Sequence, residues 1–152
     1  MFSSAGIEYR IVGGLAVYLY VEEVEPDAGR LTKDIDIAVR REDLERIAKA
    51  AEPFGLKFSH LAGVDMLVQY EQPNVRRAVH FVYMADPFSA ATVVSGLPLI
   101  PLTDLVRMKL TSFRAKDEAH IKDLDEAGLL TPEIEATLPP ELAERLAQTR
   151  QR

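Results

Sequence analysis

Apolar residues recur with two different spacings along the first part of the chain, and the change of spacing separates the predicted elements. Alternation with a period of two predicts strands, and apolar side chains three or four positions apart predict helices. The predicted elements are a strand over residues 9–12, a helix over 15–24, a loop over 25–29 and a strand over 33–40. The stretch over residues 41–55 predicts an amphipathic helix that ends before Pro53 and Gly55.

The rest of the chain predicts more strands and then helices. Residues 56–60 and 64–70 are strand-like, and residues 71–74 are a turn signal before a returning strand over 75–84, so that residues 64–84 form a hairpin. The remaining predicted elements are an irregular connection over residues 86–101, a long helix capped by Thr103 and stopped at Gly128, and a short helix over 141–150.

This order of elements favours an α/β (α+β) fold with a mixed sheet and flanking helices. A length of 152 residues fits one domain. We expect a core over residues 8–100 and a C-terminal helical segment over residues 101–150 within that single domain.

The composition narrows the expected environment of the chain. The absence of cysteine excludes disulfides and cysteine-based zinc sites, and it favours a reducing cytoplasm. The first ten residues lack the basic region and apolar run of a signal peptide, and the uncharged stretch over residues 11–21 is too short to cross a membrane. We therefore expect a cytoplasmic protein without a membrane partner.

The formal net charge of −6 disfavours broad binding to nucleic-acid backbones. A local basic patch is nevertheless present in the predicted long helix, with no acidic residue inside it. Its members are Arg107, Lys109, Arg114 and Lys116.

Two aspartates interrupt the aliphatic strand "DIDIAV". Asp34 and Asp36 lie at positions i and i+2, so their side chains leave the same face of the strand with roots about 6.5–7 Å apart. Two carboxylates at that spacing can converge on one Mg²⁺ ion, as phosphoryl and nucleotidyl transfer require. The alternative is a sheet with one solvated face, although aspartate is a poor strand former.

Two glycines stand where the first strand meets the first helix. Gly13 and Gly14 can bring backbone N–H groups close to a phosphate at a helix N-terminus. The alternative is a tight strand-to-helix turn without a ligand. The sequence contains neither the G-x-G-x-x-G nor the G-x-x-x-x-G-K-[ST] fingerprint, so dinucleotide and P-loop sites are not indicated.

Taken in order, three stretches resemble the DNA polymerase β-like nucleotidyltransferase superfamily. They are "YRIVGGLAVYLY", "RLTKDIDIAV" and "LIPLTDLVRMKLTSFRAKDEAHIKDL". The sequence is most similar to the small bacterial branch that includes the abortive-infection and toxin–antitoxin nucleotidyltransferases. The resemblance covers residues 8–39 and 98–129.

The resemblance implies transfer of a nucleoside monophosphate from an NTP to a hydroxyl, with release of pyrophosphate. It implies that Asp34 and Asp36 bind Mg²⁺. The implied acceptor is an RNA or a protein, and a cognate toxin or antitoxin protein is a further implied partner. The residues implied to contact the nucleotide are Gly13 and Gly14 through their backbone, Thr32, Lys33, Lys109, Arg114 and Lys116.

The sequence departs from the family where a third carboxylate usually follows on a neighbouring strand. The aligned position is His80, which can accept a proton but is a poor Mg²⁺ ligand. Three alternatives stay open: an altered catalytic role for His80, replacement of the acid by Asp65 or Asp86, or a site that binds nucleotide without efficient transfer. His80 can also be an ordinary hydrogen-bonded strand residue.

Other hypotheses fit parts of the pattern. The chain can be a non-catalytic module that binds nucleotide or a partner protein, for example in a toxin–antitoxin pair. A glycosyltransferase also uses D-x-D for a metal, but the glycine turn has no role in that scheme. The helical face with Lys116, His120 and Asp123, beside Asp117 and Lys122, is also typical of a solvated or locally paired surface.

Overall fold

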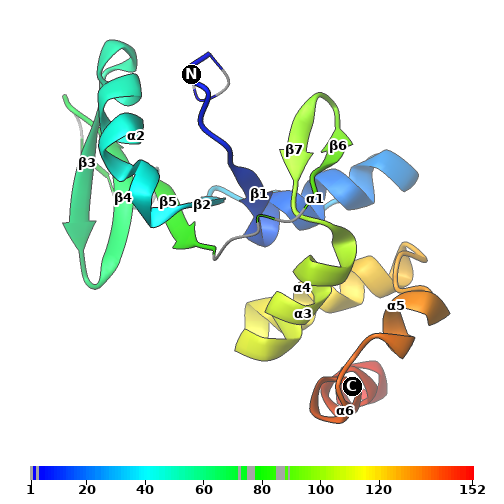
Figure 1. Cartoon of the computed structure of the whole chain (residues 1–152). Coiled ribbons are helices and arrows are strands. Elements are labelled where there is room, and N and C mark those ends of the chain that lie inside the picture. The colour runs from blue at the N-terminus through cyan, green and yellow to red at the C-terminus, as the bar shows by residue number, and fades with distance from the viewer. Residues whose placement is uncertain (1, 3, 72, 75–77, 85–87, 89) are drawn as a thin grey trace.

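In the part of the chain that the structure describes, a mixed sheet of seven strands organises the fold (Figure 1). The computed structural model describes residues 2, 4–71, 73–74, 78–84, 88 and 90–152. The strands are β1 (Arg10–Val12), β2 (Ile35–Val39), β3 (Leu56–Leu61), β4 (Val64–Gln69), β5 (Val79–Tyr83), β6 (Thr92–Val94) and β7 (Leu97–Leu99). They lie in the order β3-β4-β5-β2-β1-β7-β6.

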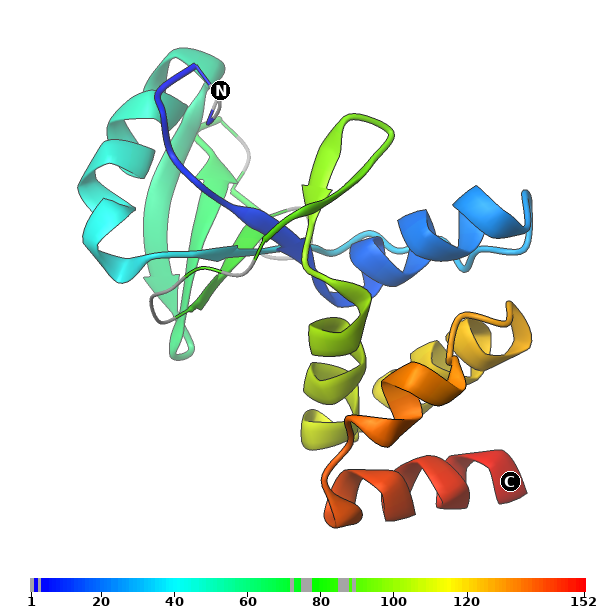
Figure 2. The ribbon, with the colours of Figure 1, turned by 45° about the vertical axis from the view of Figure 1, so that its right-hand side comes forward.

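The helices fall into two groups that lie on different sides of the molecule. The helices are α1 (Gly13–Val24), α2 (Leu44–Ala51), α3 (Leu102–Ser112), α4 (Ala115–Glu126), α5 (Pro132–Ala136) and α6 (Pro140–Gln151). The 3-10 turns η1 (Arg41–Asp43) and η2 (Glu52–Phe54) flank α2. Figure 2 shows α2 beside the β3–β5 part of the sheet, whereas α3 to α6 gather on the other side, near α1. The predicted mixed sheet with flanking helices and a C-terminal helical segment is confirmed.

The central strand β2 has a different partner on each side. It pairs parallel with β5, where Asp36 is opposite His80, and antiparallel with β1, where Asp36 is opposite Val12. Ile37 and its partner Phe81 face the other side and belong to the core that includes Ile47 of α2. The alternation along β2 therefore leaves Asp36 on the face that α2 does not cover.

The hairpin predicted for residues 64–84 is confirmed for its described part. β4 pairs antiparallel with β5 through Met66 and His80, and it also pairs antiparallel with β3. Residues 75–77 of the predicted returning strand lie outside the described residues.

The prediction of an irregular connection over residues 86–101 is wrong for residues 92–99. Residues 92–99 form the β6–β7 hairpin, and Leu99 of β7 pairs parallel with Ile11. Ser95 and Gly96 both have positive φ values, 51° and 77°, as a two-residue hairpin turn of the favoured hand requires. Strands of three residues are too short to show alternation, and Pro98 resembles a strand breaker in the sequence.

The long helix predicted after residue 103 is two helices. Thr103 is not the N-cap: α3 begins at Leu102 after Pro101. Phe113 has a φ of 46° and ends α3 before α4 begins at Ala115. The break is invisible in the sequence because non-glycine residues rarely adopt this left-handed conformation.

The predicted end of that helical region is confirmed. Gly128 has a φ of 76°, and the N–H of Leu129 donates to the carbonyl of Leu124 at 3.0 Å, as in a helix-ending Schellman motif. The final helix is also confirmed as α6, whereas α5 was not predicted. Within the part of the chain that the structure covers, every helix is too short or too polar to traverse a lipid bilayer.

Candidate functional site

A cavity of about 890 Å³ lies between the sheet and helices α3 and α4. Its walls come from β1, β2, β4 and β5, from the first turn of α1 and from the facing sides of α3 and α4. The predicted site residues that line it are Gly13, Gly14, Thr32, Asp34, Asp36, His80, Lys109, Arg114 and Lys116. Lys33 is exposed and is not among the residues lining the cavity.

Gly13 controls the approach of α1 to the sheet. Its φ of 66° is costly for any residue with a side chain, and a Cβ at this position would lie 2.5 Å from Oδ2 of Asp36. The backbone of the first turn therefore comes directly against this carboxylate. The preceding residue is Val12, whose side chain has no oxygen with which to cap the first N–H groups of α1, so these donors remain for other acceptors.

Asp36 and His80 form the polar pair at the centre of the sheet face. Nδ1 of His80 lies 3.4 Å from Oδ1 of Asp36, and both side chains are partly buried. Asp34 precedes β2 and is held by a local contact, because its N–H donates to Oγ1 of Thr32 at 3.1 Å. Thr32 thus fixes the approach of the chain to the aspartate pair.

The donor set of this cavity fits one magnesium ion for which the protein supplies some ligands and water and a phosphate supply the others. Mg²⁺ is commonly bound through one or two carboxylates, with water and phosphate oxygens filling the other positions. Asp34 and Asp36 supply two carboxylates to the cavity wall. Among the residues that the structure describes, no group of three or more His, Asp or Glu side chains is arranged to hold a metal by itself.

Of the two acids considered as substitutes for a third carboxylate, Asp65 does not join this group. Met66 pairs with His80, so Asp65 points to the opposite face of the sheet, where Tyr83 donates to it and His60 pairs with it. The hydrogen bond from Tyr83, followed by that from His60, lowers the pKa of Asp65. Asp86 lies outside the described residues.

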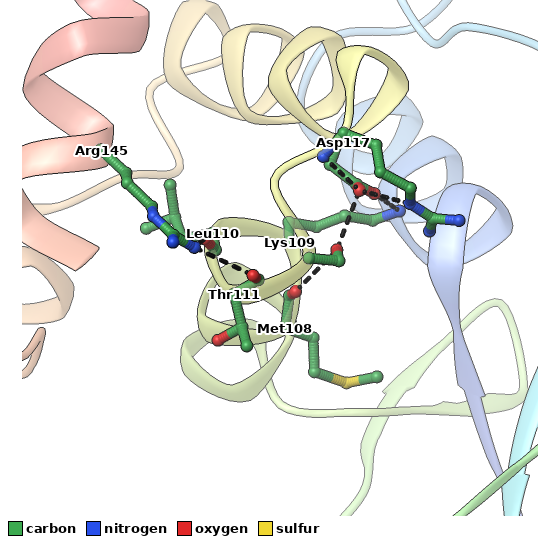
Figure 3. Close-up of polar contacts among 8 residues, drawn as sticks. Met108, Lys109, Leu110, Thr111, Asp117 and Arg145 are labelled. Atoms are coloured by element: carbon green, nitrogen blue, oxygen red, sulfur yellow. Dashed lines mark hydrogen bonds and ion pairs between the residues drawn. The ribbon is translucent and has the colours of Figure 1, made fainter. Parts of the chain in front are cut away.

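A buried ion pair joins the two helices of the opposite wall (Figure 3). Nζ of Lys109 on α3 lies 3.2 Å from Oδ1 of Asp117 on α4. Oδ2 of Asp117 also accepts hydrogen bonds from Ser112 Oγ at 2.8 Å and from the backbone N and Nε of Arg114, both at 3.0 Å. Asp117 is completely buried, so of the alternative that this helical face is a solvated or locally paired surface, the local pairing holds for Asp117 and the solvation does not.

The hydrogen bonds determine the charge state of this pair. Burial alone would raise the pKa of Asp117, but donation from Arg114, Ser112 and Lys109 outweighs burial and lowers it. Burial also lowers the pKa of Lys109, while Asp117 acts in the opposite direction. Lys109 is therefore a wall residue that is paired with Asp117. Arg107, Arg114 and Lys116 line the cavity as exposed cations.

Sequence reasoning missed the position of His120. Its imidazole lines the cavity and packs against Gly14, and burial, followed by the charge of Lys109, lowers its pKa to about 4. The spacing of Lys116, His120 and Asp123 was a usable signal, but it fits a solvated face equally well. Asp123 is in fact paired with Arg30, at 3.0 Å, from the loop before β2.

No family model and no curated protein match this sequence. Solved structures with a similar fold do exist. An antigenic nucleotidyltransferase-like protein from Paracoccidioides brasiliensis is 19% identical, with a TM-score of 0.61, over 99% of this chain and 82% of that one. The antibiotic-resistance factor ANT(2″)-Ia, in complex with adenylyl-2″-tobramycin, is 15% identical with a TM-score of 0.53, over 99% of this chain and 91% of that one.

A Megavirus polyadenylate synthase is 10% identical with a TM-score of 0.50, and the match spans 97% of this chain but 31% of the synthase. At these identities the likeness concerns the fold alone, and this chain has a fold similar to that of these solved structures. The more specific resemblance to the abortive-infection and toxin–antitoxin branch stays a prediction.

Proposed function

We propose that this protein is a Mg²⁺-dependent nucleotidyltransferase that moves a nucleoside monophosphate from an NTP to an acceptor hydroxyl and releases pyrophosphate. One observation carries the proposal: the first turn of α1 lies against Asp36 in a cavity that also contains Asp34 and His80. That arrangement combines anion-binding backbone donors with metal-binding carboxylates. The nucleotidyltransferase fold supports the same chemistry.

The triphosphate would lie between the first turn of α1 and the α3–α4 wall. The N–H groups after Gly13 provide donors at the positive end of the helix dipole. Arg114 and Lys116 supply positive charge from the facing wall, and Thr32 lies beside the aspartates. Lys33 is retained as a nucleotide contact only for its place in the chain between Thr32 and Asp34, because its side chain is exposed and outside the cavity lining.

Asp34 and Asp36 would hold Mg²⁺. When bound, the ion would offset the charge of the phosphates and orient the reacting groups. His80 would take the proton of the acceptor hydroxyl as its oxygen bonds to the α-phosphorus and the bond to pyrophosphate breaks. The contact between His80 Nδ1 and Asp36 supports this role, since a neighbouring carboxylate orients an imidazole.

A second candidate function is nucleotide binding without efficient transfer. It is favoured by the two-carboxylate donor set, in which a histidine stands where a third acid is usual for the family. Structures of this fold also include ANT(2″)-Ia with adenylyl-2″-tobramycin, a molecule in which an adenylyl group is joined to an acceptor. We therefore place transfer first and binding alone second.

We also propose that residues 8–100 and 101–150 act as one domain, because the cavity takes its walls from both parts.

Labelled NTPs test the proposed reaction directly. The protein is incubated with each α-³²P-labelled NTP, Mg²⁺ and either total RNA or cell-lysate protein, and transferred label is measured with and without a chelator. We expect Mg²⁺-dependent labelling of an acceptor or of the protein itself. Asp34→Asn and Asp36→Asn should lower labelling at least about 100-fold, as loss of a group acting in the transition state does.

Asp65→Asn is the matched control, since it removes a carboxylate from the same sheet but outside the cavity. This control should retain wild-type labelling. Equal background labelling by wild type and the Asp34 and Asp36 variants would exclude transfer, and NTP binding without labelling would support the second candidate.

A further inference from the structure

His120 of α4 packs against the helix that begins at Gly13. A Cβ placed on Gly14 would lie 3.1 Å from Cε1 and 3.2 Å from Nε2 of His120, and 3.4 Å from Oγ1 of Thr32. The missing side chain of Gly14 therefore makes room for the imidazole. The first turn of α1 contacts Asp36 at Gly13 and His120 at Gly14, so both side chains adjoin the same N–H donors.

One nitrogen of His120 lacks a partner. Its Nδ1 is buried and makes no hydrogen bond to any described residue. Buried polar atoms in native proteins are nearly always paired, and an exception at a binding site indicates a missing ligand or water. The same imidazole lines the cavity, and its Cε1 and Nε2 are the atoms that lie nearest to Gly14.

The surroundings keep the imidazole uncharged. Burial and the Lys109 charge on α3 lower the pKa of His120 to about 4, and Arg30, from the loop before β2, acts in the same direction. Asp117 and Asp123 on α4 act against this shift without reversing it. At neutral pH His120 therefore offers one N–H donor and one lone pair. Such a side chain can bind an anion without placing another positive charge beside Lys109.

We propose that His120 is a nucleotide-binding residue, whose imidazole N–H donates to a phosphate oxygen of an NTP bound at the N-terminus of α1. This assignment rests on the proposed function, because it requires the triphosphate to lie at that helix end. Its packing against Gly14, together with a buried nitrogen that has no partner among the described residues, distinguishes it from the paired side chains of the same wall. The neighbouring Asp117 and Asp123 are already engaged by Lys109 and Arg30.

Calorimetric titration of the full chain with Mg²⁺ and α,β-methylene-ATP tests the assignment. His120→Phe keeps a ring and removes the donor, and we expect it to weaken binding about tenfold, the effect of losing one hydrogen bond to a charged group. His120→Gln keeps an N–H donor and should stay within about threefold of wild type. His60→Phe, at an exposed histidine outside the cavity, should bind as wild type does.

Adenosine, which has no phosphate, should bind wild type and His120→Phe equally. Wild-type affinity of His120→Phe for the ATP analogue would overturn the assignment while leaving the proposed function intact. Absence of binding by wild type itself would instead overturn the proposed function and the assignment with it.

Nitrogen-15 NMR of the wild-type imidazole decides the question even where a variant fails to fold. Bound phosphates favour the protonated form of a nearby histidine, so the ATP analogue should move the His120 resonances and raise their titration midpoint above about 5. A midpoint that does not move when the cavity is saturated would overturn the assignment.

Discussion

At the residue scale, Gly13 sets the distance between the helix and the carboxylate. Two separate constraints meet there: a φ of 66° and an Asp36 oxygen where a Cβ would project. Gly128 has nearly the same conformation, with a φ of 76°, but apart from its chain neighbours no heavy atom of the described residues lies within 4 Å of its Cβ position. The two glycines therefore share a left-handed backbone conformation, but only Gly13 of this pair lies in close contact with another side chain, that of Asp36.

This difference predicts distinct results for two alanine substitutions. Gly128→Ala should lower the free energy of unfolding by about 1–2 kcal/mol through left-handed strain alone. Gly13→Ala should lower it further and weaken Mg²⁺–ATP binding at least about tenfold, because the new methyl group must displace Asp36 or the first turn. Urea unfolding and calorimetry check both values. Equal stability and unchanged binding in the two variants would show that the contact with Asp36 is unimportant.

The sequence predicted the glycine and aspartate pairs because both patterns are local. The structure brings these residues into one cavity. The sequence could not reveal that Asp117 is buried or that His120 reaches Gly14, since charged residues at helical spacing resemble a solvated face until the packing partners are known. Asp36 lies opposite His80 because β2 and β5 pair in a parallel register, and the sequence does not reveal that register because the two strands are far apart along the chain.

At the element scale, Arg145 of α6 holds the end of α3 in place (Figure 3). Its Nη1 donates to the carbonyls of Leu110 and Thr111 at 2.8 and 2.9 Å, and its guanidinium lies 5.3 Å from the ring centroid of Phe113. The last carbonyls of a helix have no partner within the helix. Arg145 supplies that partner at the turn where α3 gives way to α4.

Replacement of Arg145 should therefore destabilise the helical segment. We expect Arg145→Met to lower the free energy of unfolding by about 1–3 kcal/mol, because it leaves carbonyl groups unsatisfied. Arg145→Lys should fall between wild type and Arg145→Met, since an ammonium keeps the charge but not the planar two-carbonyl contact. Arg152→Met removes a surface pair with Glu118 at the end of the same helix and should cost less than about 1 kcal/mol.

Urea unfolding followed by circular dichroism measures these differences. If Arg145→Met were no less stable than Arg152→Met, the contact with the end of α3 would not contribute to stability.

Elements were predictable where they were long enough to show a repeat. The periods along β2 and α1 identified both, and Gly128 gave the end of α4. The β6–β7 hairpin and the α3–α4 break were missed because they depend on pairing with β1 and on the left-handed conformation of Phe113. Neither cause leaves a pattern in the local sequence.

At the scale of the whole molecule, the central claim is that sheet and helices enclose one Mg²⁺–NTP site. The resemblance in sequence covered two separated stretches, and the fold brings both to the walls of one cavity. Solved structures with a similar fold match nearly the whole chain at 10–19% identity. The order of elements and a few motif residues predicted the fold, whereas no residue pattern in the sequence identifies the acceptor.

A crystal structure of the protein with Mg²⁺ and α,β-methylene-ATP tests this claim most directly. We predict phosphates at the N-terminus of α1, Mg²⁺ between Asp34, Asp36 and phosphate oxygens, and the His120 imidazole within hydrogen-bonding distance of a phosphate. A nucleotide bound elsewhere, or a metal that contacts neither aspartate, would contradict the account.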